Sequence, residues 1–210
     1  MEEKNRSRLI VFVKNPRKGE VKTRLAADVG EKKALTIYHQ LLDHTRIAAL
    51  SVDVNRQVWY ADEIDTNDEW SNDDFSHKVQ WGDDLGERMH NAFESAFEEG
   101  CQKVVIIGSD CPELTPIVLE QAFRTLDNSE VVIGPARDGG YYLLGMKRLI
   151  PELFEGKRWS TSTVLEDTLL DLKQLGITWQ RLPELTDIDT AEDWLNFMAH
   201  SRHAKDFYNS

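Results

Sequence analysis

A basic loop directly follows the first apolar run of the sequence, in a chain whose formal net charge is −12. Five Lys and Arg residues lie between Lys14 and Arg24, after the apolar run 9–13. Ligands of open α/β sheets bind at the carboxyl ends of strands, so this position favours a phosphate site. Lys14, Lys22 and Arg24 are therefore candidate phosphate ligands. A solvated surface loop is the alternative, and the segment alone favours neither.

Carboxylates occur where two further strands are expected to end. Asp110 follows the apolar run 103–108, with Ser109 beside it, and Asp187 and Asp189 lie between an expected strand and an expected helix. Carboxylate oxygens are hard ligands of the kind that hold Mg²⁺ or Mn²⁺, usually together with substrate phosphates. Asp110 could instead cap a turn, and either late Asp could be structural. Only convergence of Asp110 with Asp189 would make a metal site.

Two glycine-containing segments supply further candidates. Asp138 precedes Gly139 and Gly140, which would let the backbone approach a ligand closely, although a turn explains these glycines equally well. Gly86 and Arg88 stand at the start of an expected helix, where backbone N–H groups and a guanidinium can bind anions. The alternative there is a capped surface helix with an exposed Arg88.

The elements that must position these residues alternate between strand-like and helix-like patterns, which is typical of a sheet with helices packed on it. The central strand is expected at 103–108, whose apolar run is unbroken. The spacing between 131–135 and 141–145 allows these two strands to pair in antiparallel orientation, which would make the sheet mixed. Capping boxes predict helix starts at Thr163 and, more weakly, at Thr190. The remaining expected strands are 8–13, 57–61, 78–81 and 178–182, and the remaining expected helices are 32–50, 85–100 and 116–126.

Length and composition predict a single domain over residues 1–210, with its core at about 8–198. The chain has 210 residues, of which 40% are hydrophobic and 30% charged, as in soluble globular proteins. No segment is long enough to cross a bilayer, and two cysteines fit free thiols in a reducing compartment, so a cytoplasmic location is expected. The acidic balance argues against binding of nucleic acid or anionic membranes.

Six short motifs, taken in order, resemble those of a known bacterial family. They are 12–16, 19–25, 82–89, 107–112, 138–145 and 187–190. The combination is similar to the glycosyltransferase-A-like proteins described as selenodomain-associated or arsenosugar-biosynthesis transferases, and it is more specific than any one motif. The resemblance covers about 8–198. It implies the nucleotide-diphospho-sugar transferase fold, an α/β single-domain Rossmann-like α/β/α sandwich with a mixed central sheet.

The leading hypothesis for the reaction is a metal-dependent transferase with a nucleotide-activated donor, which moves a glycosyl group from a nucleotide-diphospho-sugar to a small acceptor. Lys22 and Arg24 would stabilise the departing diphosphate together with Mg²⁺ or Mn²⁺. The cation would bind Asp110 and Asp189, and Asp138 would orient the acceptor hydroxyl or act as a base. The expected nucleotide-binding residues are Lys14, Lys22, Arg24, Gly86, Arg88 and Ser109.

The segment 22–25 is also similar to that of the 2-phospholactate guanylyltransferases, which share the fold but transfer a nucleotidyl group and release pyrophosphate. A glycine-rich nucleotidyltransferase loop is not found in the sequence, and Gly108 stands where a full Asp-X-Asp motif would need its first Asp. A non-catalytic nucleotide-binding protein is the third reading, because a fold alone does not imply a function. The sequence leaves the oligomeric state open.

Overall fold

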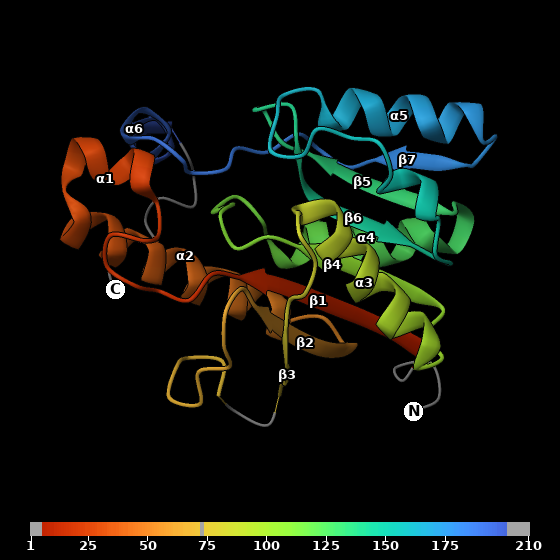
Figure 1. Ribbon diagram of the computed structural model, residues 1–210, viewed down its shortest axis with the longest axis horizontal. Helices are drawn as coiled ribbons and strands as arrows, with labels where there is room; N and C mark the ends of the chain where they lie inside the picture. Colours follow the sequence, from red (N-terminus) through yellow and green to blue (C-terminus); the bar gives the residue numbers. More distant parts are fainter. Residues whose placement is uncertain (1–5, 72–73, 201–210) are drawn as a thin grey trace.

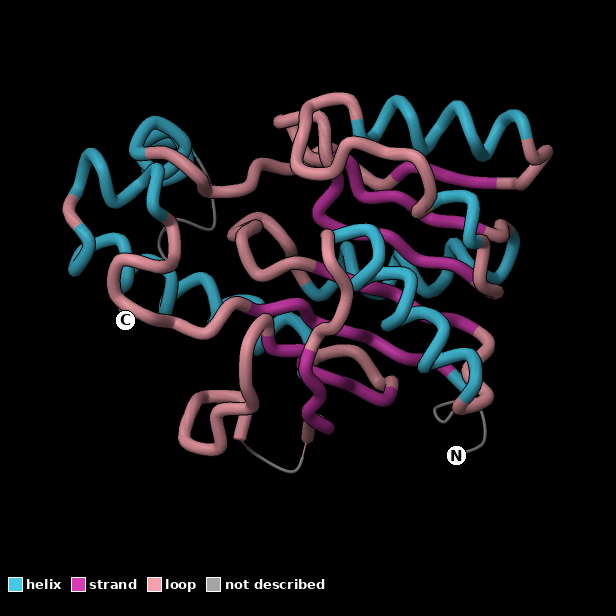
Figure 2. Tube along the Cα trace, viewed as in Figure 1, coloured by secondary structure: helices cyan, strands magenta, loops and turns pink. Residues whose placement is uncertain are grey.

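The computed structural model describes residues 6–71 and 74–200, in which helices lie on both faces of a seven-stranded sheet (Figures 1 and 2). Residues 1–5, 72–73 and 201–210 of the expected domain lie outside the described residues. The strands are β1 (Ser7–Val13), β2 (Asn55–Tyr60), β3 (Ser76–Val79), β4 (Lys103–Ile107), β5 (Val131–Pro135), β6 (Tyr141–Met146) and β7 (Trp179–Arg181). The helices are α1 (Thr23–Val29), α2 (Glu31–Leu50), α3 (Leu85–Glu98), α4 (Pro116–Asn128), α5 (Val164–Gln174) and α6 (Ala191–His200), with a short 3-10 helix, η2 (Pro151–Leu153), before α5.

Strand β4 forms the centre of the sheet, as its unbroken apolar sequence predicts. The strand order is β3-β2-β1-β4-β6-β5-β7. β1 is parallel to β2 and β4, β2 to β3, and β5 to β7, whereas β6 runs antiparallel to both β4 and β5. The expected mixed sheet is therefore confirmed, with β6 as its antiparallel strand.

Alternate side chains of β1 divide the core into two layers. Leu9 and Val11 pack with buried residues of α2 and α4, whereas Ile10 packs with buried residues of α3 and α5. Consecutive side chains of a strand point to opposite faces, so one strand anchors both layers. Figure 1 shows α3 and α5 on the face toward the viewer, with α4 behind the sheet. The α/β/α sandwich expected from the sequence is confirmed.

A third apolar cluster joins α1, α2 and α6 beyond the end of β1 (Figure 1). Leu25 of α1, Ile37 of α2 and Phe197 of α6 pack there with Ile188, whose side chain is fully buried. The backbone N–H of Ile188 also donates a hydrogen bond of 2.9 Å to the carbonyl oxygen of Asp110. Two separate interactions therefore hold the segment before α6 next to the loop after β4.

Helix α1 lies partly in the segment that the sequence indicated as a basic loop. Among its seven residues only Leu25 is buried, so the sequence carries no amphipathic repeat that would predict a helix. Lys22 precedes α1 in the left-handed conformation, with φ 50°. Gly30, with φ 84°, separates α1 from α2.

The two expected capping boxes have different outcomes. At the start of α6 the backbone N–H of Thr190 donates to Asp193 Oδ2 at 2.8 Å, and the backbone N–H of Asp193 donates to Thr190 Oγ1 at 3.2 Å. That box is confirmed. At the start of α5 the box is wrong, because Thr163 has a helical ψ of −8° and, among the described residues, its side chain accepts no backbone hydrogen bond. Its hydroxyl donates to Asp167 Oδ2 instead.

The cysteines are free thiols, as expected. Cys101 and Cys111 are both buried and unpaired. Burial raises the pKa of the Cys111 thiol well above its usual value, so this thiol stays protonated and unreactive near neutral pH. Separately, none of the described helices combines the length and the apolar sequence that crossing a membrane would require.

Candidate functional site

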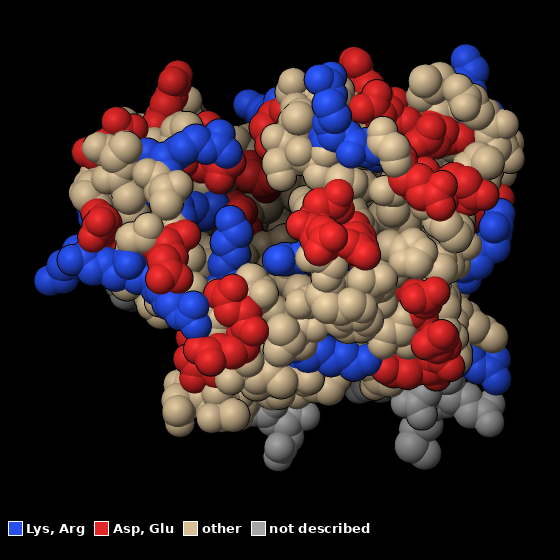
Figure 3. Space-filling view, in the orientation of Figure 1, with Lys and Arg blue, Asp and Glu red and all other residues tan. Residues whose placement is uncertain are grey.

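The loops that carry most of the candidate residues leave the sheet at one edge. β1, β4 and β5 run in the same direction, so Lys14, Asp110 and Asp138 all follow strands that end at this edge. Figure 3 shows a hollow in the surface between the part formed by α1 and α6 and the part over α3, with basic and acidic side chains on its walls. This is the edge at which open α/β sheets bind ligands.

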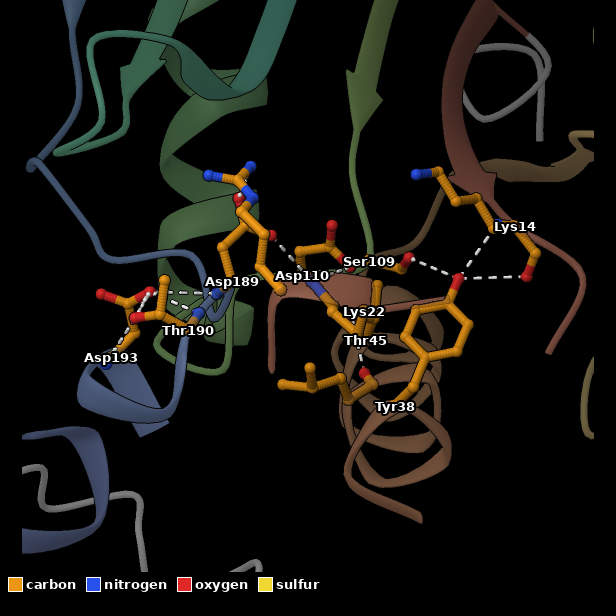
Figure 4. Close-up of polar contacts among 11 residues, drawn as sticks. Lys14, Lys22, Tyr38, Thr45, Ser109, Asp110, Asp189, Thr190 and Asp193 are labelled. Carbon is orange, nitrogen blue, oxygen red and sulfur yellow. Dashed lines mark hydrogen bonds and ion pairs between the residues drawn. The ribbon is translucent and has the colours of Figure 1, made fainter. Parts of the chain in front are cut away.

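Lys22 is the centre of the charged groups at this edge (Figure 4). Its Nζ lies 2.9 Å from Asp110 Oδ1 and 3.4 Å from Asp189 Oδ1, and its side chain is only 4% exposed. The left-handed backbone of a non-glycine residue costs about 1–2 kcal/mol. Such strain persists only where the surroundings enforce it. The first turn of α1 does so, because the carbonyl oxygen of Lys22 accepts the N–H of Ala26 at 2.8 Å.

Asp189 pairs with a second basic side chain, Arg24, and its backbone is hydrogen-bonded to a residue of α6. Arg24 Nη2 lies 2.9 Å from Asp189 Oδ2, although the Arg24 side chain itself is 74% exposed. The backbone N–H of Asp189 donates to Asp193 Oδ2 at 3.1 Å. The structure thus brings together four of the residues singled out from the sequence: Lys22, Arg24, Asp110 and Asp189.

Asp187 adds a third carboxylate that is poorly compensated. Its Oδ1 is buried and has no hydrogen-bond partner among the described residues. Burial, together with the negative charges of Asp110 and Asp138 and against the lowering effect of Lys22, raises the pKa of Asp187 to about 7. Near neutral pH the Asp187 carboxyl is therefore protonated in a large fraction of molecules, and Lys22 and Arg24 pair with Asp110 and Asp189 instead.

Lys14 and Ser109 are joined through a buried tyrosine of α2 (Figure 4). The Tyr38 hydroxyl accepts the backbone N–H of Lys14 at 2.9 Å, donates to its carbonyl oxygen at 3.0 Å and lies 3.4 Å from Ser109 Oγ. Burial raises the pKa of Tyr38, so the hydroxyl stays neutral. Tyr38 therefore fixes the β1 loop against the β4 loop, and the exposed side chain of Lys14 extends away from it.

Gly86 and Arg88 lie at the start of α3, and their contacts are with neighbouring segments. Asp84 caps this helix by accepting the N–H of Glu87 at 2.9 Å. A Cβ at Gly86 would stand 2.1 Å from the Trp159 ring, so the glycine allows the ring to pack on the helix. Arg88 Nε donates to the carbonyl oxygen of Gly82 at 3.1 Å. Among the described residues, no hydrogen bond or ion pair joins Gly86 or Arg88 to Lys22.

Asp138 lies in the turn between β5 and β6, with its side chain exposed. Its Oδ1 accepts the backbone N–H of Gly140 at 2.9 Å. Gly139 has φ 90°, and a Cβ there would stand 2.1 Å from the carbonyl oxygen of Ser162. The turn is therefore packed against the segment before α5. Asp138 is near enough to Asp187 to influence its pKa, but it has no ion pair with Lys22 or Arg24 among the described residues.

Two residues that hold the loops of the site in place, Tyr38 and Asn15, were not identified from the sequence. Tyr38 occupies the apolar face of an amphipathic helix and looks like an ordinary core residue. Asn15 is buried, and its side chain donates to the carbonyl oxygen of Glu63 and accepts the N–H of Asp62. An Asn directly after a strand and before Pro16 was the available hint that this loop is held by side-chain hydrogen bonds.

Two cavities lie away from the Lys22 cluster, which consists of Lys22, Arg24, Asp110 and Asp189. A cavity of about 590 Å³ lies at the opposite, amino-terminal edge of β1 to β3, lined in part by Arg8, Lys78 and Glu99. Glu99 pairs with both Arg8 and Lys78. A second cavity, of about 320 Å³, lies between the β1 loop and 63–67, next to Asn15. We place the site at the Lys22 cluster because the strand ends converge there and the unpaired carboxylate is there.

Residues 45–161 match the family described as an uncharacterized protein conserved in bacteria (DUF2064). The chain belongs to this family. The matched range of this DUF2064 protein includes Asp110 and Asp138, whereas Lys22, Arg24 and Asp189 lie outside it. Among curated proteins, no match is found.

Solved structures confirm the nucleotide-diphospho-sugar transferase fold of this DUF2064 protein. A crystal structure described as a "putative nucleotide-diphospho-sugar transferase" from Desulfovibrio desulfuricans G20 has 31% sequence identity and a TM-score of 0.86, over 97% of this chain and 95% of that chain. The inositol-1-phosphate CTP transferase of T. maritima has 15% identity and a TM-score of 0.58, over 89% and 90% of the two chains. Rv0371c of Mycobacterium tuberculosis H37Rv, in complex with manganese, has 11% identity and a TM-score of 0.55, over 93% and 98%. At 15% and 11% identity the likeness is one of fold alone.

Proposed function

We propose that the protein transfers a glycosyl group from a nucleotide-diphospho-sugar to the hydroxyl of a small acceptor. The observation that carries this proposal is the buried Lys22 ammonium between Asp110 and Asp189, at the strand ends where this fold binds ligands. The description of the Desulfovibrio desulfuricans relative, 31% identical over nearly the whole chain, supports a nucleotide-diphospho-sugar donor.

In the proposed reaction, the acceptor oxygen bonds to the anomeric carbon as the bond from that carbon to the diphosphate oxygen breaks. The nucleoside diphosphate leaves with the bonding electron pair. Lys22 and Arg24 stabilise the charge that develops on it, and the buried Lys22 acts more strongly than the exposed Arg24 because such interactions are stronger where water is excluded. Asp138, exposed in the turn after β5, takes the proton of the acceptor hydroxyl.

The proposed cation site consists of Asp110 and Asp189. Their hard oxygen ligands suit Mg²⁺ or Mn²⁺, and the buried Oδ1 of the nearby Asp187 has no hydrogen-bond partner among the described residues. The described residues contain no ready-made group of three metal-binding side chains, which agrees with a cation held partly by donor phosphates. A bound divalent cation would supply positive charge at the departing diphosphate. The manganese complex of Rv0371c, which shares the fold, is consistent with this.

Nucleotide binding is proposed for the remaining candidates. The exposed Lys14 would contact phosphate, with its backbone position fixed by Tyr38. Ser109 would support the β4 loop or offer its hydroxyl. Gly86 and Arg88 would present the first turn of α3 to the nucleotide, since backbone N–H groups at a helix start favour anions.

The second candidate function is nucleotidyl transfer from a nucleoside triphosphate, with release of pyrophosphate. The T. maritima relative is a CTP transferase with the same fold, and the resemblance of 22–25 to guanylyltransferases favours the same chemistry. Lys22 and Arg24 would then act on the α-phosphate and the leaving pyrophosphate. A nucleotide-binding protein without turnover is the third candidate.

The products distinguish these candidates. The protein is incubated with nucleotide sugars or nucleoside triphosphates, with Mg²⁺ or Mn²⁺ and a mixture of small hydroxyl acceptors, and ³¹P NMR follows the products. Nucleoside diphosphate that appears only with acceptor supports glycosyl transfer, whereas pyrophosphate supports nucleotidyl transfer. Asp138→Asn should lower the rate about 100-fold or more if Asp138 is the base. Asp28→Asn, an exposed change in α1, is the matched control and should leave the rate unchanged.

A further inference from the structure

One ammonium group takes the position at which the two proposed metal ligands face each other. Lys22 Nζ is within 3.4 Å of an oxygen of both Asp110 and Asp189. Mg²⁺ binds oxygen at about 2.0–2.1 Å, so a cation shared by these carboxylates would occupy nearly the same point and would require only a small approach of the two side chains. The ammonium and a divalent cation cannot be there together.

The surroundings favour a cation of higher charge at this point. The carboxylates of Asp110 and Asp189 both contact Lys22, and among the described residues Arg24 pairs with Asp189 alone. Asp187 Oδ1 remains buried without a partner among the described residues. The Lys22 ammonium brings one positive charge to the point between Asp110 and Asp189, whereas a divalent cation would bring two to the same hard oxygen ligands.

We infer that Lys22 is a placeholder for the divalent cation in the nucleotide-free protein, and that the two compete for Asp110 and Asp189. This inference rests on the proposed metal-assisted transfer. Lys22 suits such an exchange because its backbone is fixed by α1, whereas its long side chain can turn about four bonds.

The competition has a direct consequence for donor binding. Cation binding releases the Lys22 ammonium from the carboxylates, and the free ammonium can then pair with the donor diphosphate. Cation and donor consequently favour each other's binding, and by linkage each raises the affinity of the other by the same factor. Without donor the cation binds weakly.

The test is Mn²⁺ affinity in the absence of any nucleotide, measured by the EPR signal of free Mn²⁺. Lys22→Met keeps the side-chain length and removes the competing charge. We expect this variant to bind Mn²⁺ at least 10-fold more tightly than the wild-type protein. Equal or weaker binding by a folded Lys22→Met variant would overturn the inference, because removal of a placeholder must strengthen binding.

Three further variants make the result specific. Lys18→Met removes an exposed lysine of the same loop, which pairs with Glu31 at 3.5 Å and with no other described residue, and should leave Mn²⁺ affinity unchanged. Lys22→Arg keeps the charge and should stay within about threefold of wild type. The double variant Lys22→Met with Asp110→Asn should not show the increase in Mn²⁺ affinity, because one of the two proposed ligands is removed. Tight binding by Lys22→Arg, or a gain that survives Asp110→Asn, contradicts the inference.

Circular dichroism at 222 nm and thermal unfolding show whether each variant is folded. If Lys22→Met fails to fold, Lys22→Gln replaces it with the same expected gain. The ³¹P NMR assay in EDTA separates this inference from the proposed function. Transfer that persists in EDTA, with no Mn²⁺ bound by wild type or variant, refutes the placeholder but leaves glycosyl transfer intact. No transfer under any condition, with the expected gain in Mn²⁺ affinity, refutes the proposed function and keeps the placeholder.

Discussion

Single residues of the candidate site are linked by charge rather than by a preformed ligand cage. Lys22 holds Asp110 and Asp189 together, and Arg24 holds Asp189 from the solvent side. Only the Lys22 side chain is buried among the four, so removal of its carboxylate partners would leave a buried charge behind, which is costly. At Asp187 one oxygen is already buried without a partner among the described residues.

Asp187 should make the stability of the protein depend on pH. Its pKa is raised from 3.8 to about 7, so between these values the folded state binds more protons than the unfolded state, and stability falls as pH rises through this window. Asp187→Asn removes the effect. In EDTA the variant should exceed wild type by roughly 2–4 kcal/mol in the free energy of unfolding at pH 8 and by nothing at pH 3.5.

Urea denaturation at a series of pH values measures this difference. Asp28→Asn changes an exposed carboxylate of α1 and should show no pH-dependent difference from wild type. A difference between Asp187→Asn and wild type that is constant over the whole pH range would contradict the assignment of the raised pKa.

At the residue scale, the sequence indicated the charged side chains of the site but not the hydrogen bonds that hold their loops in place. Asp110 and Lys22 follow strands that are parallel, so their convergence followed from the topology alone. The bonds from the Tyr38 hydroxyl to Lys14 join residues 24 positions apart. The pattern of an amphipathic helix cannot reveal them, because the same pattern predicts a plain core tyrosine.

Two helix starts show how the same sequence pattern gives different stabilisation. Thr190 and Asp193 form a reciprocal capping box, whereas Thr163 forms no backbone cap among the described residues. Thr190→Ala should therefore lower the free energy of unfolding by about 1 kcal/mol. Thr163→Ala is the matched control and should cost less than half of that. Guanidinium chloride denaturation measures both, and equal losses would contradict the difference in capping.

The start of α3 depends on the absence of a side chain at Gly86. A Cβ there would meet the Trp159 ring at 2.1 Å, so Gly86→Ala should lower the free energy of unfolding by about 1–3 kcal/mol. Gly108→Ala, where a Cβ would meet no described atom within 4 Å, should cost much less. In the double variant Gly86→Ala with Trp159→Ala, the two losses should be clearly less than additive, which a double-mutant cycle detects.

At the element scale, the hydrophobic periodicity predicted the strands and the long helices, but it did not predict the short helix α1. β4 and α3 have strong apolar patterns and were expected within two residues of their ends. α1 was missed because its one buried side chain, Leu25, gives no period. Its position depends on packing against α2 and α6. Because α6 is distant from α1 in the sequence, a local pattern cannot predict this packing.

The whole molecule is organised around a sheet to which both ends of the described chain contribute. Leu9 of β1 and Leu182 after β7 belong to the same core cluster, and Ile188 joins α6 to α1 and α2. We therefore propose that residues 1–210 fold as a single domain. The sequence predicted this from length and from the lack of a linker, but it could not show which elements share a core.

A single domain should unfold in one cooperative transition. No described part of the sheet has a core of its own, because β1 contributes to the clusters on both faces, and separation of any portion would expose apolar surface on the remainder. Differential scanning calorimetry should give one peak whose calorimetric enthalpy equals its van't Hoff enthalpy, at roughly 0.7 kcal/mol per residue near 60 °C. Phe197→Ala should shift this peak as a whole to lower temperature. A separate early transition in that variant would instead mean that α1, α2 and α6, which hold Lys22 and Asp189 in place, unfold apart from the sheet.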